Sequence, residues 1–202
     1  MGRYNGPKAR INRRLGAMVY ETNGAIKAYD RRNYPPGMFT RRGKLSTFGT
    51  GLYEKQKIKH YYGLREAQLR KYYDKASRMS GNTGDQLLLL CERRLDNVIR
   101  RAGLTKTRLQ ARQGVVHNHI MVNGVKVNKP SFSVRPGDVI TIRNRTNLKA
   151  IYRQYADENT IENVSWLHFD PDELKITVTG YPGHDDITIP IEVGLVIEFM
   201  AL

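Results

Sequence analysis

The chain lacks several features of secreted and membrane-spanning proteins. Its 202 residues include one cysteine, Cys91, so an intrachain disulfide is impossible and a reducing compartment fits best. The longest apolar run, Leu87–Cys91, is far shorter than the roughly 20 residues of a transmembrane helix. The N-terminus has no apolar signal core. We therefore expect a cytoplasmic protein, or one made inside an organelle, with no membrane partner.

Acidic residues are scarce over the first three quarters of the chain. Residues 1–149 contain 32 Lys and Arg but 9 Asp and Glu, whereas residues 150–202 contain 2 and 10. Solubility alone does not require such segregation, and the basic part indicates a polyanionic partner. We expect residues 1–149 to face nucleic acid and the acidic quarter to face solvent or basic protein.

Motifs of catalysis and metal binding are also missing. The sequence has no nucleophile elbow, P-loop or dinucleotide fingerprint. Asp185 and Asp186 are adjacent in a loop, where side chains point apart, so we assign them to the surface. His117 and His119 have no cysteine or carboxylate pair at zinc-ligand spacing. We expect no enzymatic activity, no cofactor and no metal.

Gly, Arg, Lys and Tyr dominate residues 1–52, which have few aliphatic residues. Such a segment buries too little apolar surface to offset its ordering entropy, so it is predicted to be an extended basic arm. Its arginines lie beside tyrosines, a combination suited to phosphate contact and base stacking.

Helical spacing begins at Tyr53 and continues to Arg78, with a break at Gly63. Thr83 resembles the cap of a long helix over about 85–102, which is apolar on more than one side and so predicted to bridge two domains. Thr105 is the expected cap of a further helix over about 106–116.

Alternating residues then indicate strands. IMV and VKV flank Asn123-Gly124, the strongest short-range signal of a hairpin. SFSV and VITIR, joined by the turn RPGD, predict further strands. Beyond residue 150 the pattern is mixed.

The predicted fold class is α+β: a mostly helical N-terminal domain with an extended basic arm, and a small module of two helices packed on a short antiparallel sheet. The expected boundaries are an arm over 1–52, a helical domain over 53–92 completed by about 186–202, an RNA-binding module over 93–150, and a mixed segment over 151–185 that continues the second domain.

The candidate site lies in that module. Arg108 and Arg112 are four residues apart and share a helix face. Gln113, His117 and His119 follow at the exit of the helix. Positive and hydrogen-bonding groups therefore gather at one helix–strand junction, where they could hold a bent RNA backbone.

The stretch RRLDNVIRRAGLTKTRLQARQGVVHNHIMVNGVKVNKPSFSVRPGDVI closely resembles the RNA-binding module named after bacterial small ribosomal subunit protein four. MGRYNGPKARINRRLG resembles the N-terminus of that family, and LYEKQKIKHYYGLREAQLRKYYDKA resembles its first helices. The resemblance covers residues 1–145 well and the rest loosely.

This resemblance implies a structural protein of the small subunit that binds a multi-helix junction of 16S-type rRNA, nucleates subunit assembly and influences translational accuracy. It implies small-subunit proteins three and five as neighbours, mRNA close to the path by which it enters the subunit, and no homo-oligomer. The residues expected on RNA are Arg3, Tyr4, Arg10, Arg13, Arg14, Arg41, Arg42, Lys55, Lys57, Lys59, Arg94, Thr105, Arg108, Arg112, Gln113, His117, His119, Lys126 and Arg143.

Gly114 is a departure from the family pattern. Glycine is about 1 kcal/mol less favourable than alanine in a helix, so we expect the helix to end at Gln113. Val116 and Asn118 also depart, as does the C-terminal FMAL, which lacks the family's aromatic and basic residues.

Two other functions fit parts of the pattern. A free RNA chaperone or translational repressor could use the same RNA-binding residues. An RNA-modifying enzyme can carry the same module, but only the acidic 53 residues from Ala150 remain for a catalytic domain. The sequence does not distinguish a bacterial from an organellar ribosome.

Overall fold

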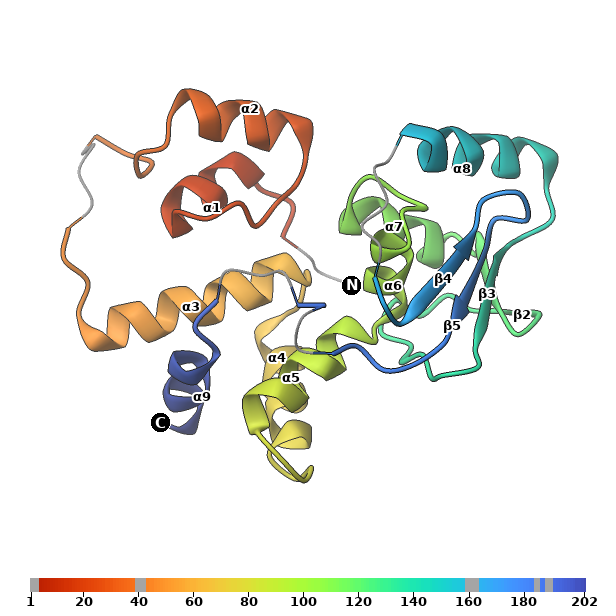
Figure 1. Cartoon of the computed structure of the whole chain (residues 1–202). Helices are drawn as coiled ribbons and strands as arrows, with labels where there is room; N and C mark the ends of the chain where they lie inside the picture. The colour runs from red at the N-terminus through yellow and green to blue at the C-terminus, as the bar shows by residue number, and fades with distance from the viewer. Residues whose placement is uncertain (1–3, 39–42, 159–163, 184–185, 188–190) are drawn as a thin grey trace. The chain divides into compact units, whose positions relative to one another are not determined.

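The computed structural model describes all residues except 1–3, 39–42, 159–163, 184–185 and 188–190. It divides into two compact units, residues 1–87 with 189–202 and residues 88–188. The described elements, of which Figure 1 labels all except β1, are α1 (Lys8–Leu15), α2 (Asn23–Arg31), α3 (Thr47–Tyr61), α4 (Glu66–Ala76), α5 (Thr83–Glu92), α6 (Leu95–Arg101), α7 (Arg108–Val116), β1 (Ile120–Val122), β2 (Val125–Lys126), β3 (Val139–Ile142), α8 (Thr146–Glu158), β4 (Leu167–Asp170), β5 (Lys175–Val178) and α9 (Val193–Ala201).

The basic arm contains two helices, which differs from the extended segment that we expected. Asn12 is fully buried and organises the turn after α1. Its Nδ2 donates to the Tyr20 carbonyl at 3.0 Å, and its Oδ1 accepts from the backbone N–H groups of Val19 and Tyr20 at 3.2 and 2.9 Å. Gly16, with φ 66°, ends α1 in the left-handed conformation. Satisfied backbone groups around one buried amide thus compensate for a small apolar core.

In the first unit, α3 packs closely against the C-terminal helix α9. A Cβ at Gly51 would lie 3.1 Å from the side chain of Phe199, so only glycine allows this approach without a shift. Glu54 accepts a hydrogen bond from the N–H of Glu192, just before α9, at 3.2 Å. The break predicted at Gly63 is confirmed: it separates α3 from α4 and has φ 60°.

The long helix predicted over 85–102 is wrong, because the structure has two helices there. Between α5 and α6 the chain turns to meet a later loop: the N–H of Leu95 donates to Phe132, and the N–H of Val134 donates to Arg93, both at 2.9 Å. These bonds replace the helical partners at the break. Asn82, whose Oδ1 accepts from the Gly84 N–H at 2.8 Å, caps α5 in place of Thr83, which is the first residue of the helix.

Helix α7 differs from the prediction at its start, whereas its end at Val116 agrees with the predicted range of about 106–116. Thr107 caps it, because its hydroxyl accepts from the N–H of Gln110 at 3.2 Å; Thr105 lies outside the helix. The helix does not end at Gln113 but continues through Gly114 to Val116. Gly114 is buried, and a Cβ there would collide with the hydroxyl of Tyr152 from α8. The glycine therefore serves close packing, at the expense of helix propensity.

The second unit contains an antiparallel sheet in the order β2-β1-β3-β5-β4. The predicted hairpin is confirmed, with Met121 paired to Lys126 and Asn123 and Gly124 at positive φ in the turn. SFSV forms no strand; Ser133 makes only an isolated bridge to Arg94. Strands β4 and β5 come from the segment beyond residue 150, so the sheet is larger than predicted.

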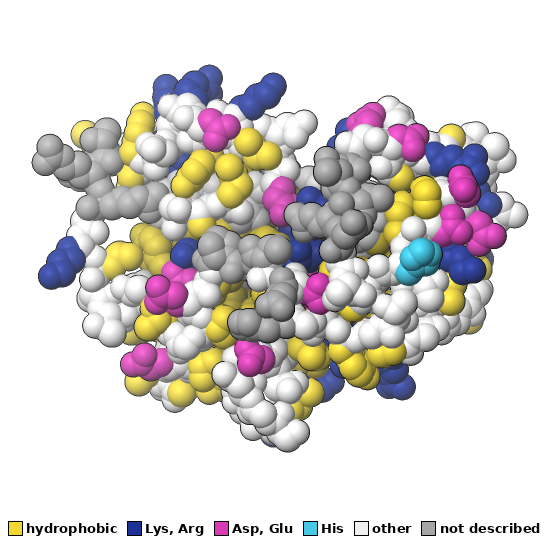
Figure 2. Space-filling view, in the orientation of Figure 1, with side chains coloured by type: hydrophobic (Ala, Val, Ile, Leu, Met, Phe, Trp, Pro, Cys, Tyr) yellow, Lys and Arg dark blue, Asp and Glu magenta, His cyan; other side chains and the backbone are white. Residues whose placement is uncertain are grey.

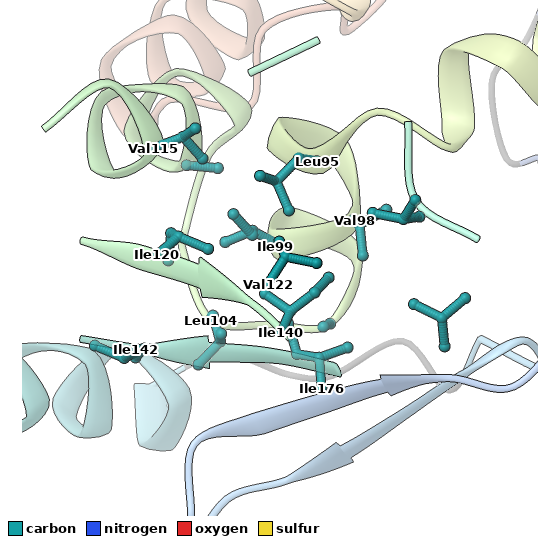
Figure 3. Close-up of a cluster of buried hydrophobic side chains, with 14 of the residues drawn as sticks. Leu95, Val98, Ile99, Leu104, Val115, Ile120, Val122, Ile140, Ile142 and Ile176 are labelled. Carbon is teal, nitrogen blue, oxygen red and sulfur yellow. The ribbon is translucent and has the colours of Figure 1, made fainter. Parts of the chain in front are cut away.

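A buried apolar cluster joins α6 and α7 to this sheet (Figure 3). Leu95 and Ile99 of α6 lie over Ile120 and Ile140, which are fully buried, as is Ile176 of β5. Each such side chain contributes about 1.5–3 kcal/mol by burial. Tyr152 and Trp166 join the same cluster. The predicted α+β class, with helices packed on a small antiparallel sheet, is confirmed.

Candidate nucleic-acid interface

Arg108 and Arg112 lie one turn apart on α7, and both are oriented by polar residues of α6. The Nε of Arg108 donates to Asn97 Oδ1 at 2.8 Å. The Nη1 of Arg112 lies 3.2 Å from Asp96 Oδ2. Anchoring on α6 lowers the side-chain entropy that either guanidinium would lose on binding a ligand. The two arginines are therefore preoriented as a pair.

A buried ion pair between Glu92 and Arg101 supports the arrangement of Arg108 and Arg112. Arg101 donates through Nη2 and Nε to the two carboxylate oxygens of Glu92, at 2.9 and 3.1 Å. The Nδ2 of Asn97 donates to the same carboxylate at 2.5 Å. Asn97 thus connects the Glu92–Arg101 pair to Arg108. Because each buried charge has an opposite partner, the network can hold α6 and α7 rigidly together.

Arg94 and Thr105 do not belong to an exposed surface, which corrects the sequence prediction. Arg94 is 1% exposed, and its guanidinium donates through Nε and Nη2 to Asp96 at 3.0 and 2.7 Å. Thr105 is fully buried and its hydroxyl donates to the Thr107 carbonyl at 3.4 Å. Side chains this buried cannot meet RNA without local unfolding. Their polar contacts with Asp96 and Thr107 lie within the protein.

The exit of α7 brings Gln113, His117 and His119 together as predicted. The Nε2 atoms of Gln113 and His117 lie 2.6 Å apart, and the two imidazole rings meet edge to face at 5.9 Å. The Nδ1 of His119 is 3.3 Å from the Tyr152 hydroxyl. Burial, with smaller contributions from the charges of His117 and Arg145, lowers the pKa of His119. Its ring is therefore neutral near pH 7.

A groove of about 600 Å³ lies beside these histidines, entirely within the second unit. Its lining includes His117, His119, Arg143, Arg145 and Ile151. The N–H of Arg143 donates to the His119 carbonyl at 2.8 Å, which ties the end of β3 to the start of β1. Lys126 is exposed on the hairpin strand β2 and does not line this groove.

The residues expected on RNA in the arm have different surroundings. Arg10 and Arg14 are exposed on α1. Arg13 is held within the unit: its Nε donates to the Tyr34 carbonyl at 2.9 Å, and its guanidinium lies 4.8 Å from the centre of the Tyr34 ring. Tyr4 is half-buried against Tyr20. The predictions for Arg3, Arg41 and Arg42 lie outside the described residues. Figure 2 shows Lys and Arg side chains projecting at the edge of the unit where α2 lies.

The three lysines of α3 are engaged in ion pairs within their unit. Lys55 and Lys59 lie 2.6 and 3.0 Å from the carboxylate of Glu66, and Lys57 lies 2.5 Å from Glu54. Burial would raise the pKa of Glu66, but hydrogen bonds and charge from Lys55 and Lys59 outweigh it and lower that pKa. The three lysines therefore share two neighbouring carboxylates, which balance part of their positive charge.

Sequence reasoning missed the residues that position the predicted ones. Asp96 and Asn97 carry no signal of their own, because polar residues at the start of a helix are common. Arg145 lies within the predicted module and Ile151 directly after it, and neither was singled out as a site residue. Only the folded chain brings them beside His119.

Two classes of feature are absent from the described part of the chain. Its His, Cys, Asp and Glu residues form no group of three or more that could hold a metal ion. Within the same residues, no helix has the length and apolar character to cross a membrane.

The fold and the interface define a polyanion-binding protein, with an α+β module whose helix–strand junction presents oriented arginines and imidazoles. Residues 3–92 match the ribosomal protein S4/S9 N-terminal domain, and residues 93–140 match the S4 domain. The chain belongs to this ribosomal protein S4 family.

Curated relatives align over the whole chain. The small ribosomal subunit protein uS4 of Rhodopirellula baltica is 56% identical over 201 residues, covering 100% of both chains. The proteins of the same name from Persephonella marina and Aquifex aeolicus are 42% and 44% identical, covering 100% and 98% of both chains. This membership confirms the resemblance found in the sequence and the expectation that the chain is not an enzyme.

Proposed function

We propose that this protein is a structural constituent of the small ribosomal subunit that binds a multi-helix junction of 16S-type rRNA. The observation that carries the proposal is the 56% identity, over the full length of both chains, to a protein named for that subunit. The charge segregation supports it, because cations dominate residues 1–149 and carboxylates the remainder.

By family resemblance, the protein binds the rRNA early and nucleates subunit assembly. It neighbours small-subunit proteins three and five, borders the path of incoming mRNA and influences translational accuracy on a cytoplasmic ribosome. These roles need a rigid surface matched to one RNA fold. The buried network beneath Arg108 and Arg112 supports such rigidity, because it fixes both side chains before RNA arrives.

Within this function the RNA-facing residues are a subset of those expected from the sequence. In the second unit they are Arg108, Arg112, Gln113, His117, His119, Lys126 and Arg143. In the first unit they are Arg10 and Arg14 of α1, with Arg3, Tyr4, Arg13, Arg41, Arg42, Lys55, Lys57 and Lys59 as further candidates. Arg94 and Thr105 are left out because they are buried.

The direct test compares a junction-containing rRNA fragment with scrambled RNA of equal length at about 0.15 M salt. Specific affinity should exceed non-specific affinity by at least about a thousandfold, the lower end for nucleic-acid-binding proteins. Equal affinity for the two RNAs would contradict the proposal. Co-sedimentation of the endogenous protein with small subunits after a high-salt wash tests its place in the ribosome.

A second test uses the double variant Arg108→Ala/Arg112→Ala. Each lost phosphate contact lowers the steepness of log K against log salt by about 0.7–0.9, and because Arg112 is paired with Asp96 and contributes less, we expect a decrease of about 0.7–1.5. The matched control is Arg153→Ala/Lys175→Ala, which removes the same charge from the acidic segment of the same unit. Equal slopes for the two variants would remove the assigned role of α7. Thermal melting checks that both variants remain folded.

A further inference from the structure

The groove beside the α7 exit combines apolar, aromatic and cationic residues in one concave site. Leu148 and Ile151 of α8 supply apolar surface, and Ile151 is 45% exposed although it is a large hydrophobic residue. His119 supplies a ring held by the Tyr152 hydroxyl at 3.3 Å. Arg145 supplies positive charge at the same groove. A phosphate alone would gain nothing from the apolar part.

The size of the groove suits a nucleotide better than a helix. Its volume of about 600 Å³ falls within the range of about 300–1,000 Å³ that is usual for small-ligand sites. A double-stranded RNA helix presents a wide and shallow minor groove, which a concave site cannot follow. An unstacked nucleotide has an apolar base face, a hydrogen-bonding base edge and an adjacent phosphate. These three parts match the three kinds of residue in the groove.

We propose that this groove holds one unstacked nucleotide of the bound RNA, with its base against Ile151 and Leu148 and its phosphate against Arg143 and Arg145. Asn118 and Asn147, which also line the groove, offer an amide donor and acceptor each to the base edge. The proposal rests on the proposed function, and it adds the class of ligand that this groove takes.

The protonation of His119 is compatible with a nucleotide base as the ligand. Burial and the nearby His117 and Arg145 lower the pKa of His119, so a neutral ring faces the base at pH 7. A neutral imidazole can pack on a base without the desolvation penalty of a charged group. The cationic contribution then comes from the arginines, which stay charged at any relevant pH.

The experiment uses the full chain and two substitutions that bring the same new charge to α8. Ile151→Asp places a carboxylate inside the groove, whereas Gln154→Asp places one at an exposed position of the same helix outside it. Arg145→Ala is compared in the same way with Arg153→Ala. The probes are the junction-containing rRNA fragment and a fully paired RNA duplex of 20 base pairs.

Base packing in such sites is worth roughly a tenfold change in affinity or more. Ile151→Asp should therefore weaken junction binding about tenfold relative to Gln154→Asp, while duplex binding changes equally in both. The methyl resonance of Ile151 should shift when the junction binds and stay in place with the duplex.

The possible failures are distinguishable. If the unmodified protein prefers the junction but Ile151→Asp and Gln154→Asp weaken it equally and the Ile151 methyl does not shift, the groove proposal is overturned and the proposed function stands. If the unmodified protein binds junction and scrambled RNA equally, both are overturned.

Discussion

Replacing Gly114 with alanine should destabilise the second unit, although alanine is the better helix former. Helix propensity alone favours the alanine by about 1 kcal/mol. The new Cβ, however, would collide with the Tyr152 hydroxyl, while the ring carbon Cζ lies at an ordinary 3.6 Å. Tyr152 is 4% exposed within the apolar cluster, so its ring cannot move aside alone.

The opposing contributions can be compared in size. Overpacking a core costs about 1–3 kcal/mol, and losing the Tyr152–His119 hydrogen bond costs about 1 kcal/mol. After subtraction of the propensity gain of about 1 kcal/mol, we expect a net loss of about 1–3 kcal/mol in the free energy of unfolding. Urea denaturation followed by the fluorescence of Trp166, which is buried in the same unit, measures it.

A double-mutant cycle isolates the cause. Tyr152→Phe removes the colliding hydroxyl and keeps the ring. In that background Gly114→Ala should be neutral or stabilising by up to about 1 kcal/mol, because only the propensity term remains. The reasoning is refuted if Gly114→Ala stabilises the natural protein, or if its effect is the same in both backgrounds.

Three further changes have expected outcomes. Arg101→Met should cost about 3–5 kcal/mol in urea denaturation by breaking the buried ion pair with Glu92, and Glu92→Leu added to it should recover much of the loss; no recovery would contradict the ion-pair assignment. Burial, with a smaller contribution from a lysine charge, lowers the pKa of His60 to about 4, below its unfolded value of 6.5. The neutral His60 ring therefore contributes fully to stability above pH 6.5, and this contribution is lost as the pH falls towards 4. His60→Gln should therefore flatten the melting temperature across that range, and an unchanged pH profile would count against it. Asp96→Asn removes a negative charge yet should weaken rRNA binding by the folded protein about two- to fivefold, because Arg112 loses its anchor; the buried Arg94 loses the same carboxylate charge, so urea denaturation is measured in parallel, and stronger binding would show that charge alone governs affinity.

Local chemistry explains the parts of the fold that the sequence could predict. The turn at Asn123-Gly124 needs two positive φ angles, and these two residue types tolerate them. Gly63 ends a helix for the same reason. Both signals lie within a few residues of the structure they determine, so no tertiary information is needed.

The sequence predictions fail where residues distant in the chain determine the local structure. The break between α5 and α6 depends on backbone hydrogen bonds from Leu95 and Val134 across nearly forty residues of chain, which periodicity cannot reveal. Helix α1 ends in a turn built around Asn12, a residue whose burial no composition argument anticipates. In both cases the polar backbone is satisfied by tertiary contacts that the sequence pattern does not contain.

The same limit applies to the charges of the interface. Sequence reasoning treats every lysine and arginine of the basic region alike, but the fold pairs Lys55, Lys57 and Arg94 with carboxylates inside the protein. A cation that is already paired neutralises phosphate less fully, because RNA must first displace its carboxylate partner, so fewer counterions leave the RNA. The slope of log K against log salt should therefore fall well below the number of cationic residues singled out in the sequence. A slope that equals this number would mean that these ion pairs open on binding.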